Sequence, residues 1–315
     1  MATHYRPTPW QKFRRDPSTQ LAFWLQSRRR HTSTPGDAAT AAGSSSPISI
    51  ICVSDTHCTQ PEVPDGDVLL HAGDLTNRGS FEELQEQLDW LNTMPHRYKV
   101  VIGGNHDKLL DAEYVRQFPD RIYEGEGTSR SDLDWGDIIY LHNSSTTLRF
   151  ANGRRLKVYG SPLTELCGTW AFQYPPIRQV WAGAVPEDTD ILLTHGPPRG
   201  HLDNRGKGCP QLLREVCRVR PRLVVFGHIH AGAGLEEMTY SGADRAYHCV
   251  MTGEGGLLAV ALMAFWVLVE CIWPRRGTEH TTTLVNAAVV GGQKSELAVK
   301  VVDMWACGHA QRHAA

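Results

Sequence analysis

Five short apolar runs, rich in β-branched residues, are each followed at once by polar side chains, which is typical of buried strands. They are Ile48–Val53, Asp67–Leu70, Tyr98–Ile102, Asp190–Leu193 and Arg222–Phe226. Helices are expected at Phe81–Leu91, where apolar positions have helical spacing, and at Lys108–Phe118 and Cys209–Val219. This alternation predicts an α/β fold with parallel strands.

The middle and the end of the chain add further strands. Thr146–Phe150 and Leu156–Tyr159 are short alternating runs next to Asn-Gly and Gly-Ser, which predicts hairpins. Thr283–Val290 and Leu297–Val302 also have strand character. Periodicity alone therefore supports an α/β protein with hairpins.

Between these regions, Leu257–Trp273 is apolar at every position except Glu270. As a helix it would be about 25 Å long, slightly short of the ~20 residues that a membrane span needs. If the strands after it belong to the same domain, a span would carry them across the bilayer. We therefore expect this helix to pack on the domain or to insert shallowly into a membrane surface.

The first 47 residues are expected to be an extension. Trp10–Arg30 combines aromatic residues with arginines, which suits a membrane-surface helix, a transit peptide or a segment that docks on its own domain. Thr32–Pro47 is a Ser/Thr/Ala/Gly/Pro tract, which predicts a disordered linker. The principal domain is predicted at 48–305, with the apolar insert at about 255–275 and a tail at 306–315.

Composition narrows the possible partners. The formal charge of -2 argues against binding of nucleic acid polymers, which usually requires a strongly basic face. None of the eight cysteines forms a Cys-x-x-Cys pair, and no clear signal segment begins the chain, so we expect an intracellular, cytoplasmic protein with possible membrane association. Cys58 is interpreted as an apolar filler.

Six of the 15 histidines lie in polar or loop contexts and are predicted to be solvated: His31, His96, His142, His248, His280 and His309. The others include residues that follow the predicted strands. The strand ends together carry Asp55, His57, Asp74, Asn105, His106, Asp107, His195, His228 and His230. Carboxylate, imidazole and amide groups in this number suit a pair of divalent ions such as Mn, Fe or Zn, which can assist phosphoester hydrolysis.

The order Asp-x-His, Gly-Asp, Gly-Asn-His-Asp, His, Gly-His-x-His resembles the signature of the calcineurin-like metallophosphoesterases. Within that superfamily the chain looks most like the metallophosphoesterase domain-containing proteins, through Gly66–His71, Tyr159–Pro162 and Asp190–Pro198. The similarity runs from about 48 to 233 and resumes near 284–287. It implies a four-layer αββα sandwich of two mixed sheets, with two divalent or mixed-valence ions at the strand ends.

The resemblance also implies a role for each residue. Asp55, His57 and His230 would hold one metal, Asn105, His195 and His228 the other, and Asp74 would bridge them. His106 would donate a proton to the leaving oxygen or stabilise charge on the phosphoryl group, with Asp107 holding its ring. The nucleophile would be a metal-bridging hydroxide, which attacks in line.

Two positions bear on the substrate. Asn77 stands where protein phosphatases of the superfamily carry a second aspartate, and Gly103 stands where they carry an arginine. Without that clamp on a phosphomonoester, the favoured function is hydrolysis of a phosphodiester or of a nucleotide, and the resemblance itself implies hydrolysis of a cyclic nucleotide. The alternatives are a phosphomonoesterase or protein phosphatase, and a membrane-surface adaptor with marginal turnover, in contact with a membrane through 10–30 and 257–273.

Overall fold

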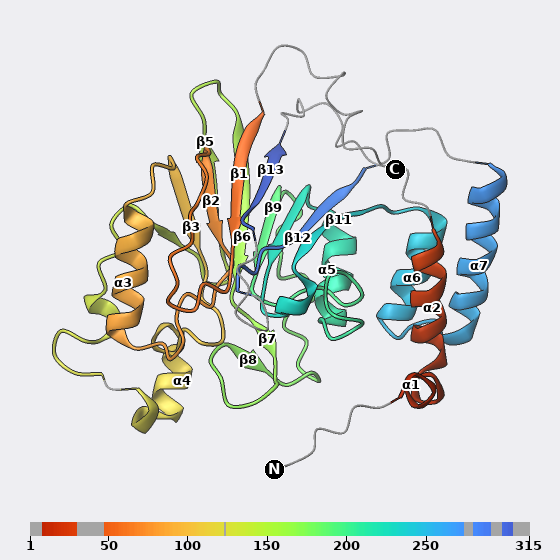
Figure 1. Ribbon diagram of the computed structural model, residues 1–315, viewed down its shortest axis with the longest axis horizontal. Coiled ribbons are helices and arrows are strands. Elements are labelled where there is room, and N and C mark those ends of the chain that lie inside the picture. The colour runs from red at the N-terminus through yellow and green to blue at the C-terminus, as the bar shows by residue number, and fades with distance from the viewer. Residues whose placement is uncertain (1–7, 30–46, 123, 274–279, 291–297, 305–315) are drawn as a thin grey trace.

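The computed structural model describes residues 8–29, 47–122, 124–273, 280–290 and 298–304. Two mixed sheets lie face to face at its centre, with helices on the outer side of each (Figure 1). This arrangement is the four-layer sandwich that the resemblance implies. The predicted linker at 32–47, apart from its last residue, and the tail at 306–315 lie outside the described residues.

The first sheet has five strands in the order β13-β1-β2-β3-β4, and all neighbours are parallel except β13 and β1. Its strands are β1 (Ile48–Val53), β2 (Val68–His71), β3 (Tyr98–Val101), β4 (Ile139–Tyr140) and β13 (Lys300–Met304). Because β1, β2 and β3 run in one direction, their carboxyl ends meet at one edge of the sheet.

The second sheet has six strands in the order β11-β12-β10-β9-β6-β5, with parallel pairing from β12 to β6 and antiparallel pairing at both ends. Its strands are β5 (Ser144–Arg149), β6 (Arg155–Ser161), β9 (Ile191–Thr194), β10 (Leu223–Phe226), β11 (Gly234–Met238) and β12 (Thr282–Asn286). The predicted hairpin is the β5–β6 pair. A small parallel pair joins β7 (Thr164–Glu165) to β8 (Gln173–Tyr174).

Three apolar cores separate the four layers. The central core joins side chains of both sheets, including Ile50, Leu70, Val100, Leu193 and Val225. The outer core of the first sheet is covered by α3 (Phe81–Asn92) and α4 (Ala112–Gln117). That of the second is covered by α5 (Pro210–Val219), α6 (Gly242–Met251), α7 (Gly256–Ile272) and α2 (Pro17–Arg28).

The helix expected at 108–118 is broken in two. A 3₁₀ turn, Lys108–Leu110, is followed by α4, and Asp111 between them has an extended backbone with φ -99° and ψ 99°. Its carboxylate accepts hydrogen bonds from the backbone N–H groups of Glu113 and Tyr114. Asp111 is therefore the N-cap of α4. Because an N-cap residue has a non-helical backbone, the 3₁₀ turn Lys108–Leu110 ends before it.

The apolar segment forms α7, whose inner face packs against α6 and α2. Within the described residues, no helix combines the length and the apolar character needed to cross a bilayer. The strands that follow α7 divide between the sheets: β12 pairs with β10, whereas β13 pairs with β1. The chain thus returns from α7 to the centre of the same sandwich.

The N-terminal segment docks on its own chain, one of the three interpretations open from sequence. Two helices, α1 (Pro9–Arg15) and α2, are joined at Asp16, which caps α2 by accepting from the Thr19 N–H. Ala22 is fully buried in the core of the second sheet. Arg29, just after α2, donates to Asp244 of α6 and to Glu270 of α7, which fixes α2 against both helices.

Candidate metal centre

The predicted ligands lie in five loops that follow β1, β2, β3, β9 and β10, at the edge where the two sheets meet. Four of them have left-handed backbone: Asp55 (φ 56°), His57 (φ 46°), Asp74 (φ 53°) and His228 (φ 64°). Such conformations cost about 1–3 kcal/mol each in non-glycine residues and cluster at functional sites. At Gly104 a Cβ would collide with the Asp74 amide nitrogen, so only glycine lets these loops approach.

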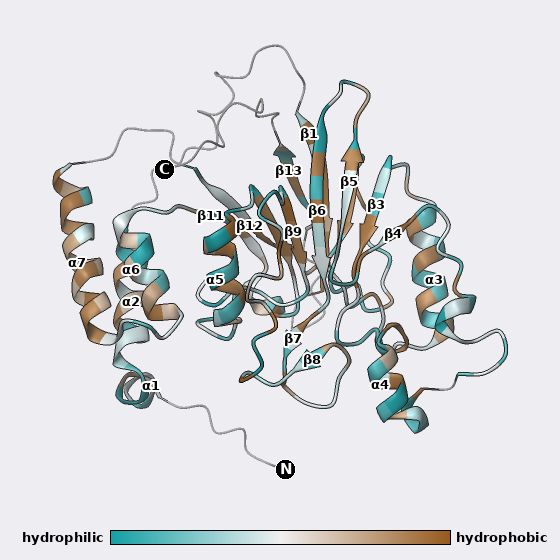
Figure 2. Cartoon of the chain, turned by 180° about the vertical axis from the view of Figure 1, so that it is seen from behind, coloured by the Kyte–Doolittle hydropathy of each residue, from teal (hydrophilic) through white to brown (hydrophobic). Residues whose placement is uncertain are grey.

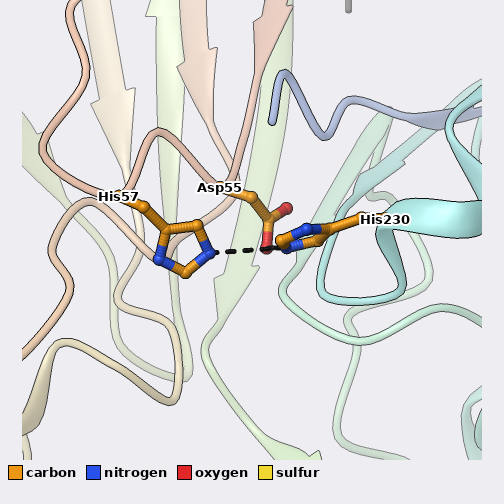
Figure 3. A group of neighbouring side chains, drawn as sticks. All are labelled: Asp55, His57 and His230. Carbon is orange, nitrogen blue, oxygen red and sulfur yellow. Dashed lines mark hydrogen bonds and ion pairs between the residues drawn. The ribbon is translucent and has the colours of Figure 1, made fainter. Parts of the chain in front are cut away.

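One group of side chains comprises Asp55, His57 and His230 (Figure 3). Nε2 of His230 lies 3.0 Å from Oδ1 of Asp55 and 3.4 Å from Nε2 of His57. Asp55 is fully buried, whereas the two histidines are partly exposed. The three residues expected on one metal are therefore together, with their ligand atoms within 4.8 Å of one another.

A second group comprises Asp74, His195 and His228. Nε2 of His195 lies 3.3 Å from Oδ1 of Asp74 and 3.0 Å from Oδ1 of Asn105. The other oxygen of Asp74, Oδ2, lies 3.8 Å from Nε2 of His57. Asp74 thus turns one oxygen toward each group, which is the position that a bridging carboxylate needs.

The hydrogen bonds of two imidazoles test whether a cation fits. Nδ1 of His57 lies 3.1 Å from the Thr76 carbonyl oxygen, and Nδ1 of His195 lies 2.8 Å from that of Ala72. Because a carbonyl only accepts, each Nδ1 carries a proton, and in the neutral ring Nε2 presents a lone pair. With both rings neutral, these lone pairs converge with carboxylate and amide oxygens, so acceptors face acceptors unless a cation, or a proton on His195, lies between them. A divalent ion satisfies such a set, and backbone-oriented histidines are common around metals.

Electrostatics favours positive charge at the same place. Burial lowers the pKa of His57 and brings that of His228 to about 4, so both rings are neutral near pH 7. Burial also disfavours a charged His195, but the Asp74 and Asp55 carboxylates outweigh it and raise its pKa to about 9. Despite burial, His195 holds the pKa of Asp74 below its ordinary value. The carboxylates therefore already stabilise a cation here.

The expectation that Asp107 holds the His106 ring is wrong. Nδ1 of His106 donates instead to the Asn77 carbonyl oxygen at 2.7 Å. The Asp107 carboxylate is buried and accepts from the backbone N–H groups of Leu75, Thr76 and Gly104 and from the Thr76 hydroxyl. Burial and the nearby Asp74 raise the pKa of Asp107 to about 6. Asp107 therefore joins the loops after β2 and β3.

His106 also contacts an aromatic residue that the motifs did not indicate. The Trp170 ring lies 4.4 Å from the His106 ring, tilted by 32°, and Lys108 Nζ lies 5.3 Å from the same indole. The backbone of Ala171 donates to the Asn105 carbonyl oxygen at 3.2 Å, which ties this loop to the metal centre. A tryptophan in a polar loop gives no periodic signal, so sequence reasoning missed it.

Two histidines predicted to be solvated are buried: His96 is 2% exposed and His248 is 5% exposed. His248 lies on the inner face of α6, and its Nε2 is 3.1 Å from that of His201. His142 and His280 are exposed as predicted, and His31 and His309 lie outside the described residues.

Two mixed sheets, with carboxylates and imidazoles converging at their common edge, agree with the calcineurin-like phosphoesterase fold. The chain belongs to the calcineurin-like phosphoesterase family, whose model matches residues 48–232.

Three relatives extend this comparison. The chain is 40% identical over 288 residues to "Probable rhamnogalacturonate lyase C" of Emericella nidulans, covering 90% of this chain and 26% of that protein. It is 39% identical to human "Metallophosphoesterase domain-containing protein 1", covering 59% and 61% of the two chains. It is 35% identical to a UPF0046 protein of Caenorhabditis elegans, covering 60% and 65%. The chain thus spans a quarter of the first relative and under two thirds of the others.

Proposed function

We propose that this protein is a dinuclear metallophosphoesterase that hydrolyses a phosphodiester, including cyclic nucleotides, or a nucleotide. The observation that carries the proposal is Asp74, whose two oxygens face His195 at 3.3 Å and His57 at 3.8 Å. One carboxylate between two ligand groups is the arrangement that a two-ion site requires. When bound, two ions polarise the phosphoryl oxygen and lower the pKa of water toward neutrality.

The region around His106 favours a diester over a monoester. A side chain at Gly103 would place its Cβ 2.8 Å from the Phe172 ring, so no arginine fits there without displacing that ring. Asn77 offers a neutral amide, and its Nδ2 donates to the His57 carbonyl oxygen at 2.9 Å. At these two positions a dianionic monoester therefore lacks the charged clamp, whereas the single charge of a diester needs less compensation.

His106 is the residue placed to exchange a proton with the leaving oxygen. Its Nδ1 proton is committed to the Asn77 carbonyl, so Nε2 carries a proton only when the ring is charged. As a general acid, His106 must therefore enter the reaction as imidazolium.

The experiment is hydrolysis of bis-p-nitrophenyl phosphate and p-nitrophenyl phosphate by purified protein supplied with Mn, with metal analysis of the same sample. We expect cleavage of the diester in preference to the monoester, and loss of at least ~100-fold in turnover for Asp74→Asn. Protein that holds two ions but cleaves neither substrate would instead support an adaptor role. Preference for the monoester would overturn the diester assignment while leaving the family function intact.

A further inference from the structure

The outer face of α7 is a continuous apolar surface without a partner among the described residues. Figures 1 and 2 place α7 at the edge of the molecule, and Figure 2 shows it apolar along most of its length. Its inner face buries Ala259, Val260 and Met263. The outer face consists of side chains that are 48–81% exposed: Leu257, Leu258, Leu262, Phe265, Leu268 and Ile272. This strip is about 25 Å long, and apolar patches of such extent usually mark a binding surface.

The polarity of α7 is the reverse of that of a helix exposed to water. Its one charged residue, Glu270, is on the inner side, where it accepts from Arg29 Nη2 at 3.1 Å. A helix at an aqueous surface turns its charges outward and its apolar side chains to the core. Here the outward face carries no charge at all, which is typical of a face that binds an apolar partner or medium.

Tryptophans and a basic residue are exposed on the helices that pack together with α7. Trp273, just after α7, is 75% exposed, and Trp10 on α1 is 66% exposed. Trp24 on α2 is 54% exposed, with the Arg28 guanidinium 5.1 Å from its ring. Because α2 contacts both α1 and α7, these residues belong to one helical body. Exposed tryptophan beside arginine is characteristic of the interface between lipid headgroups and acyl chains.

The N-terminal segment has many more basic than acidic residues. Residues 1–30 contain seven lysines and arginines but one acid, whereas the whole chain has a formal charge of -2. In α1, Arg14 and Arg15 are exposed. Basic residues beside an apolar face strengthen binding to anionic lipids.

An amphipathic helix binds a bilayer through its buried apolar area together with electrostatic attraction, so the apolar strip and the exposed basic residues of the same helices favour a lipid surface over a second copy of this chain.

We propose that α7 lies in the plane of a membrane surface, with its outer face inserted among the acyl chains of a bilayer that contains anionic lipid. The arginines of α1 and α2 contact the headgroups. This surface is formed by elements that contribute no residue to the metal centre, so the proposal does not depend on the proposed function.

The test is flotation of the full chain with vesicles of phosphatidylcholine alone and of phosphatidylcholine with phosphatidylserine. We expect binding to the mixed vesicles, weakened by salt. Leu262→Ser/Phe265→Ser should reduce it about tenfold or more, since two large side chains leave the apolar phase. Ile177→Ser is the matched control, because Ile177 is an apolar side chain that is 90% exposed in a loop away from α7. Circular dichroism checks folding, and Leu258→Ser, at a position 81% exposed, replaces the double variant if that variant fails to fold.

Three outcomes would overturn the proposal. The first is undiminished flotation of a folded α7 variant, and the second is absence of flotation of the unmodified chain. The third is a dimer in sedimentation velocity that the same substitutions dissociate, which would assign the surface to a second copy. Equal binding to both vesicle types would retain the bilayer but remove the role of the basic residues.

Discussion

His106 shows how one side chain can have a role in turnover that is separable from binding of metal. Its ring is held by the Asn77 carbonyl at 2.7 Å and covered by Trp170 at 4.4 Å. We expect His106→Asn to lower turnover of bis-p-nitrophenyl phosphate by about 10²–10⁴-fold, the usual contribution of a general acid. Metal analysis should find unchanged content. A variant that loses its ions would show instead that His106 is a ligand, since it lies near His57 and Asp74.

Asp107, next in the chain, has a structural role that predicts a different phenotype. Four donors converge on its buried carboxylate. In Asp107→Asn the amide NH₂ would face at least one of them, and an unsatisfied buried donor costs about 1–3 kcal/mol. We expect that loss in the free energy of unfolding, measured with urea. Unchanged stability with an altered pH dependence of turnover would restore the role of orienting His106.

Among the helices, Arg29 ties α2 to both α6 and α7. Its guanidinium pairs with Asp244 of α6 and Glu270 of α7, and it is only 11% exposed. Burial disfavours a charged Asp244, but the Arg29 guanidinium outweighs it and lowers the pKa of Asp244 to about 2. We expect Arg29→Met to cost about 2–3 kcal/mol by leaving both acids without their partner. Hydrogen exchange should show faster opening of α2. The neighbouring Arg28→Met is the control, because Arg28 is exposed and should cost within about 1 kcal/mol.

The His201–His248 pair joins α6 to the loop after β9 and should make stability depend on pH. Burial, with the nearby His201, lowers the pKa of His248 to about 3. Burial disfavours a charged His201 as well, but Glu236, at 2.9 Å, outweighs it and raises its pKa above 6.5. Below pH 6.5, therefore, the two histidines bind two protons in the unfolded chain but only one in the folded chain, on His201. Stability should fall with decreasing pH by about 1.4 kcal/mol per unit from His248.

The measurement is the free energy of unfolding between pH 4.5 and 6.5 for the unmodified chain and for His248→Gln. The variant should lose this part of the slope even if its absolute stability is lower. An identical slope in the His248 variant would show that the ring is protonated in the folded state.

For the whole molecule, the sequence predicted the features that depend on the local pattern of apolar and polar residues. Apolar runs followed by polar residues predicted the positions of β1, β2, β3, β9 and β10. Because the carboxyl ends of parallel strands converge, the candidate ligands could be expected to lie together. Partners that lack a side-chain signature were missed. The acceptor for His106 is a backbone carbonyl, and any residue could supply it.

Non-local pairing was also beyond the sequence. The strand β12 (Thr282–Asn286) pairs with β10, whereas β13 (Lys300–Met304) pairs with β1 in the other sheet. The residues of these two strands do not indicate which sheet each one joins. The burial of His248 likewise depends on which face of α6 meets α5 and the loop that carries His201. Such choices are made by packing between distant segments, and periodicity within one segment does not record them.

The two sheets meet at the metal centre, so bound ions should stabilise the whole sandwich. Asp55, Asp74 and Asn105 come from the first sheet, whereas His195, His228 and His230 come from the second. An ion that binds only the folded chain, present at 100 times its Kd, stabilises by about 2.7 kcal/mol. We therefore expect a chelator to lower the thermal midpoint in calorimetry and added Mn to restore it. Asp74→Asn, which removes the shared carboxylate, should respond much less to either. A midpoint that stays constant while metal analysis records loss of the ions would show that the sheets are held together by their apolar core alone.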